Sequence, residues 1–160
     1  MMNRVLDFAH MDDWERDLRA KPNDVTLLSK LGIVSAMKED EKAATAYADR
    51  AKAAIKGSTD KGQINDYADL MNAVGDMYQN GNKAEPAIPY FEASATSGAD
   101  AAKVVYGMYS EAYCYLMLNK PQQALDIANK AEALPGLSKS DADIVASLKK
   151  SATQMLKKGG

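Results

Sequence analysis

Apolar and polar residues follow one another along this chain with the spacing of an α-helix rather than that of a β-strand. Apolar residues at intervals of three or four share one face of a helix, whereas a strand places them at every second position. Three stretches show the helical spacing most clearly: Val25, Leu28, Leu31 and Val34; Ile64, Tyr67, Leu70, Met71, Val74 and Tyr78; and Ile144, Val145, Leu148, Ala152, Met155 and Leu156. The pattern therefore predicts a series of amphipathic helices.

Polar segments, many with glycine or proline, divide the chain into helix-length pieces. Breaks fall at 21–24, 38–40, 57–60, 80–82, 97–100, 119–121 and 134–137. Asp24 and Asp100 are placed to cap the helices that follow them, and Ser140 or Asp141 is placed to cap the last one. We expect Gly81 to adopt the left-handed conformation that often ends a helix. Because the connections are short, neighbouring helices should pack as antiparallel hairpins.

The amino-acid composition favours one all-α domain. The chain has 160 residues, of which 27 are Ala, only 7 are Val and only 6 are Ile. Alanine is the best helix former, whereas β-branched residues prefer strands. No flexible linker interrupts the sequence, so we expect residues 1–160 to form a single domain.

Charge and reactive residues argue against several classes of function. The net charge is −2, without the basic face typical of a nucleic-acid-binding protein. The longest apolar run is far below the ~18 residues that span a bilayer. The single cysteine, Cys114, and the single histidine, His10, can form neither an internal disulfide nor a zinc site. The sequence therefore predicts no enzyme, no metal and no cofactor. It slightly favours a cytoplasmic location, with a periplasmic one open if a signal peptide has been removed.

Three segments of the chain align with one another at identical offsets. They are Leu28, Leu31, Gly32, Ser35, Ala44, Ala48 and Ala51; Met71, Val74, Gly75, Tyr78, Ala87, Phe91 and Ser94; and Met108, Glu111, Ala112, Tyr115, Ala124, Ala128 and Ala131. Each segment is predicted to be two helices joined by a turn. We expect the small third residue of each segment to lie where its two helices cross, and the alanine at the fifth position to meet it from the second helix.

This arrangement resembles the tetratricopeptide repeat family, whose pattern is W-x2-L-G-x2-Y, then A-x3-F and P. The second segment matches best, with Met71-x2-Val74-Gly75-x2-Tyr78 followed by Ala87-x3-Phe91. The third departs most, because Glu111 takes the Leu position. The resemblance covers roughly residues 13–136. Equivalent positions are 43 and then 37 residues apart, whereas the family repeats every 34 residues.

The resemblance implies a right-handed superhelical stack of antiparallel helix hairpins. Its parts would be an N-terminal helical segment or half repeat over 1–22, repeats over 24–57, 61–98 and 100–136, and a capping helix over 140–158. In such a stack the first helix of each repeat lines the concave side. There we expect partner-binding residues from the second and third repeats, namely Asp69, Asn72, Asp76, Tyr106, Tyr109 and Tyr113.

These residues have two open interpretations. Three tyrosines on one face would supply contact area and hydroxyl groups to a bound peptide, and the adjacent carboxylates would favour a basic or amide-rich segment. The same tyrosines would serve equally well as core beneath the C-terminal helix.

The sequence thus predicts a non-catalytic protein–protein interaction module that binds a peptide or partner segment in its concave groove. The alternative is a structural scaffold segment that self-associates or belongs to a larger multi-repeat protein, since the chain opens on what resembles half a repeat.

Overall fold

The computed structural model describes residues 9–159, which form eight α-helices and no β-strand within that range. The helices are α2 (Met11–Ala20), α3 (Val25–Met37), α4 (Glu41–Ala54), α5 (Lys61–Asn80), α6 (Ala84–Ala95), α7 (Ala101–Met117), α8 (Pro121–Glu132) and α9 (Lys139–Lys158). The all-α prediction is confirmed. The N-terminal part of the predicted segment over 1–22 lies outside the described residues.

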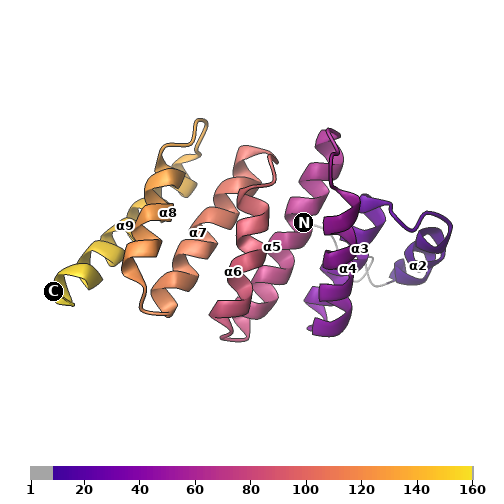
Figure 1. Ribbon diagram of the computed structural model, residues 1–160, viewed down its shortest axis with the longest axis horizontal. Helices are drawn as coiled ribbons and strands as arrows, with labels where there is room; N and C mark the ends of the chain where they lie inside the picture. The colour runs from indigo at the N-terminus through magenta and orange to yellow at the C-terminus, as the bar shows by residue number, and fades with distance from the viewer. Residues whose placement is uncertain (1–8, 160) are drawn as a thin grey trace.

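The helices form an elongated array in chain order, with α2 at one end and α9 at the other (Figure 1). Each helix packs against the next, and α3, α5, α7 and α9 also pack against one another in turn. These four helices therefore make one layer, which we call the inner layer. The helices α4, α6 and α8 lie against one face of it and form the second layer (Figure 1). Each predicted repeat range holds one helix of the inner layer and one of the second layer.

Local side chains cap the N-termini of four of these eight helices. The carboxylates of Asp24, Asp40 and Asp60 each accept a hydrogen bond, of 3.0 or 3.1 Å, from the backbone N–H three residues later. Such a bond satisfies one of the free donors at a helix N-terminus. The predicted cap at Asp24 is therefore confirmed. The last helix is instead capped by the hydroxyl of Ser138, which accepts from the N–H of Asp141.

Two other local predictions are wrong. Gly81 has a φ of −82°, and the left-handed residue is its neighbour Asn82, with a φ of 58°. Asp100 stands at the start of α7 but makes no side-chain cap. Its carboxylate accepts from the amide of Asn65 at 2.8 Å instead, and its backbone N–H donates to the same side chain. A partner 35 residues away therefore replaces the local cap.

The turns within the three predicted repeats share one backbone conformation at the spacing of the sequence repeat. Glu39, Asn82 and Asn119 all have left-handed φ values, of 59°, 58° and 56°. After each of them comes a residue whose N–H donates to a carbonyl five positions earlier: Asp40 to Ser35, Lys83 to Tyr78, and Lys120 to Tyr115. This is the bonding pattern of a Schellman turn. The repeat seen in side-chain spacing is therefore also present in the backbone.

The small residues of the repeat lie at close contacts, but not all with the expected partners. A Cβ on Gly75 would lie 2.6 Å from the ring of Phe91, and one on Gly32 would lie 2.4 Å from Leu70. The atoms nearest to these two positions thus belong to the larger side chains of Leu70 and Phe91, and not to the following alanines. In the third repeat Ala112 and Ala124 do share a core cluster, together with Ala152 of α9.

Candidate functional site

Asp69 and Asn72, two of the predicted partner-binding residues, hold α5 against α7. A carboxylate oxygen of Asp69 lies 2.6 Å from the Lys103 ammonium. The side-chain amide of Asn72 donates to the Lys103 carbonyl at 3.2 Å, and Asn72 is buried. The ammonium of Lys103 thus neutralises Asp69, and its backbone carbonyl accepts a hydrogen bond from Asn72. Sequence reasoning missed it, because no spacing along the chain indicates which residues of two helices will face each other.

Asp76 and Tyr106 are brought together further along the same pair of helices. The Tyr106 hydroxyl donates to the Asp76 carboxylate and lies 2.8 Å from each of its two oxygens. Burial raises the pKa of Asp76, and the bond from Tyr106 offsets part of that rise. Burial and the neighbouring Asp76 charge hold the pKa of the Tyr106 phenol well above its usual value. The hydroxyl therefore remains a proton donor at physiological pH.

The structure separates the remaining tyrosines, for which both interpretations were open. Tyr109 packs against the buried cluster of Val105, Ala128, Ala131 and Val145, beneath α9, and meets the Tyr106 ring edge-on at 5.1 Å. Tyr113 is 48% exposed. Tyr109 is therefore a partly buried residue packed against the core, and Tyr113 is a surface residue.

Two hollows flank the C-terminal half of α5 on the inner layer. The first, of about 460 Å³, is lined by Ala36, Met37, Glu39, Ala73, Asp76, Met77 and Asn80. The second, of about 480 Å³, is lined by Asp76, Gln79, Asn80, Asn82, Tyr106, Tyr113 and Met117. Asp76 and Asn80 belong to both. We call the two hollows together the α5 groove.

The α5 groove combines exposed apolar side chains with negative charge. Met37 at one side is 39% exposed and Met117 at the other is 40% exposed. Glu39 and Asp76 carry the formal charges, and no lysine, arginine or histidine is among the described residues that line either hollow. Of the six predicted partner-binding residues, Asp76, Tyr106 and Tyr113 line this groove, whereas the other three do not.

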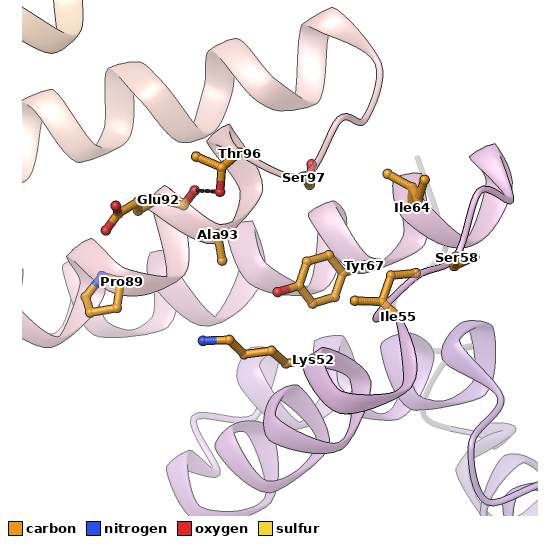
Figure 2. Close-up of a pocket in the computed structure, with 10 residues that line it drawn as sticks. All are labelled: Lys52, Ile55, Ser58, Ile64, Tyr67, Pro89, Glu92, Ala93, Thr96 and Ser97. Carbon is orange, nitrogen blue, oxygen red and sulfur yellow. Dashed lines mark hydrogen bonds between the residues drawn. The ribbon is translucent and has the colours of Figure 1, made fainter.

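A further hollow, of about 500 Å³, lies among α4, α5 and α6 and was not predicted (Figure 2). The buried ring of Tyr67 points into it, and burial raises the pKa of its hydroxyl. Lys52 and Glu92 bring opposite charges to its lining, and the Thr96 hydroxyl is already bonded to the Glu92 carbonyl. None of the exposed large apolar residues of the described chain lines it.

The residues with reactive side chains stand apart from one another. Cys114 is fully buried, and burial raises the pKa of its thiol to about 11. His10 is exposed at the start of α2, 3.8 Å from Asp13. Residues 9–159 hold no group of three histidine, cysteine or acidic side chains arranged to bind a metal ion. No helix in that range has the length and apolar character to cross a membrane.

Comparison of the chain with protein-family models, with curated proteins and with solved structures gives no significant match. What the protein does therefore has to be inferred from its own geometry.

Proposed function

We propose that this chain is a non-catalytic protein-interaction module, built from tetratricopeptide-like repeats, that binds a peptide or partner segment in the α5 groove. One observation carries the proposal. Four large apolar residues of the described chain are exposed, and three of them, Met37, Tyr113 and Met117, line the same pair of adjoining hollows. Exposed apolar side chains that cluster in a concavity are typical of interaction sites, whereas scattered ones are not informative.

The shared turn geometry supports the repeat part of the proposal. The left-handed turns recur at the offsets of the repeat, and the first helix of each pair packs on the first helix of the next. A right-handed superhelical stack of hairpins has this contact order, and it presents the first helices on its concave surface. The α5 groove lies on those helices.

The chemistry of the groove suits adaptable binding without catalysis. Methionine is flexible and polarisable, and it fits partners of different shape. Tyrosine adds area and a hydroxyl at low entropic cost. The nearby carboxylate of Asp76 is engaged with Tyr106 rather than with a nucleophile.

The second candidate function is a scaffold segment that self-associates. The fourth exposed apolar residue, Ile144, favours it, because it lies on α9, away from the groove and 37% exposed. Its exposed neighbours on that helix include Asp143, Ser147 and Lys150, and such polar surroundings disfavour a large apolar interface. We therefore place this function second.

Selection from a random dodecapeptide library displayed on phage tests the proposal. Selected peptides are synthesised with a fluorophore and titrated by anisotropy against the wild type and the Tyr113→Ser, Met117→Ser and Ile144→Ser variants, each checked for folding by circular dichroism. We expect the two groove variants to weaken binding about tenfold or more, as interface anchors do, and Ile144→Ser to have no effect. The proposal is wrong if no peptide is selected, or if only Ile144→Ser weakens binding.

A further inference from the structure

Asp76 is the one residue of the described chain with a charged side chain that lines both hollows of the α5 groove. Its carboxylate is fixed in position, because the Tyr106 hydroxyl lies within hydrogen-bond distance of both of its oxygens. A hydroxyl has a single proton, whereas a carboxylate offers about four lone-pair sites. Most of the capacity of Asp76 to accept hydrogen bonds therefore remains unused.

The charge of Asp76 is also uncompensated within the described part of the chain. Some carboxylates elsewhere on the surface have cationic partners: Asp69 pairs with Lys103, Glu41 with Lys83, and Asp100 with Lys61. Asp76 has no such partner among the described residues, although it is half-buried. A half-buried carboxylate without a cation is unfavourable, because it loses part of its hydration and no nearby positive charge compensates for that loss. Glu39, at the edge of the first hollow, adds to the negative potential.

We propose that Asp76 is the receptor for an arginine or lysine side chain of the partner segment, and that Met37 on one side and Tyr113 with Met117 on the other contact apolar residues flanking that cation. This inference rests on the proposed function and specifies its ligand. The Tyr106 hydroxyl already lies between the two carboxylate oxygens. The N–H groups of the incoming cation therefore donate to the outer lone pairs of those oxygens. The predicted occupant is thus a peptide with one basic residue between apolar ones.

The peptides selected from the dodecapeptide library provide the first test. We expect them to share an arginine or lysine with a large apolar residue within a few positions on each side. The strongest arginine peptide is then compared with the same peptide carrying citrulline, which keeps the shape of arginine and removes its charge. On the wild type, citrulline is expected to weaken binding about ten- to hundredfold, the range for a hydrogen bond to a charged group.

Two protein variants show whether Asp76 receives that charge. Asp76→Asn keeps an oxygen to accept from Tyr106, and Asp143→Asn is the matched control, because Asp143 is an exposed aspartate on α9. We expect Asp76→Asn to bind the arginine and citrulline peptides equally weakly, and Asp143→Asn to distinguish them as the wild type does.

Different failures separate this inference from the proposed function. If Met117→Ser weakens the peptide but citrulline and Asp76→Asn do not, the role of Asp76 is wrong and the groove stands. Selected peptides without a shared basic residue lead to the same conclusion. If no peptide is selected, both are wrong. The comparison of the two peptides on the wild type needs no protein variant, so it holds even if Asp76→Asn fails to fold.

Discussion

The hydroxyl of Tyr106 on α7 lies 2.8 Å from both carboxylate oxygens of Asp76 on α5, and it joins two helices that belong to different hairpins. The bond has two consequences. It couples successive repeats through the inner layer, and it holds an acidic group in place between the two hollows of the α5 groove. Hydrogen bonds to a charged group contribute more than those between neutral groups.

Removing this donor should destabilise the protein in a pH-dependent way. The pKa of Asp76 is already raised by burial, and the Tyr106 bond lowers it, so Tyr106→Phe should raise it further. A raised carboxyl pKa favours folding at low pH, and that contribution is lost as pH rises through the folded-state pKa. We expect Tyr106→Phe to lose about 1–3 kcal/mol of unfolding free energy at pH 7 and less near pH 3.5.

Urea unfolding at the two pH values measures this effect, and carbon NMR of the Asp76 carboxyl group measures its pKa. An unchanged or lowered pKa in Tyr106→Phe would show that the bond does not stabilise the charged carboxylate.

Tyr109 and Tyr113, both on α7, should respond differently to truncation. Tyr109 packs beneath α9, whereas Tyr113 is 48% exposed. We expect Tyr109→Ala to cost about 2–3 kcal/mol of unfolding free energy, somewhat below the range for fully buried aromatic residues. Tyr113→Ala should stay within about 0.5 kcal/mol, as surface changes do. Thermal unfolding of both variants tests the contrast, and equal losses would contradict the assignment of one to the core and one to the surface.

The repeated turn predicts which residue would stabilise the first hairpin. Glu39 has a left-handed φ of 59°, in the position where the other two turns have asparagine. Asparagine tolerates this conformation better than glutamate, because its short side chain can bond locally. Glu39→Asn should therefore raise the unfolding free energy by roughly 0.5–1 kcal/mol, and the reverse change, Asn82→Glu, should lower it by a similar amount. Urea midpoints measure both, and changes of the same sign would count against equivalent turns.

Glu111 should make stability depend on pH near neutrality. It is buried in α7, and burial, with the charge of Glu92, raises its pKa from 4.5 to about 7. Between these two pH values Glu111 keeps its proton in the folded state and has lost it in the unfolded state. The contribution of protonated Glu111 to stability is therefore lost as pH rises from about 4.5 to about 7. Glu111→Gln avoids the buried charge, so its advantage over the wild type should grow to the order of 2–3 kcal/mol at pH 8.

Urea unfolding at pH 5 and pH 8 measures that advantage. The exposed residue Glu85 provides the control variant Glu85→Gln, which should show no such growth. An equal effect of Glu111→Gln at both pH values would mean that Glu111 is ionised in the fold throughout.

The sequence predicts the features of this fold that depend on nearby residues. Helical periodicity and the cap at Asp24 involve positions within a few residues of each other, and both appear as expected. The failed cap at Asp100 depends on Asn65, which is distant in the chain. The displaced turn residue at Asn82 is a choice between two adjacent residues that both tolerate left-handed backbone.

The candidate site was predicted only in part, for the same reason. Helical phase places Tyr106, Tyr109 and Tyr113 on one face, but it does not indicate that α9 covers Tyr109 and leaves Tyr113 exposed. Likewise, the carboxylates of Asp69 and Asp76 look equivalent in sequence. Contact between α5 and α7 pairs Asp69 with Lys103 and Asp76 with Tyr106. Such pairings follow from the packing of whole helices.

The most direct test of the central claim is a map of backbone amide NMR shifts as a selected peptide is added. Binding in the α5 groove should perturb mainly residues 36–39, 73–82 and 106–117, which enclose the two hollows. Shifts confined to residues 52–67 and 89–97, around the Tyr67 hollow, or spread along α9 would contradict the account.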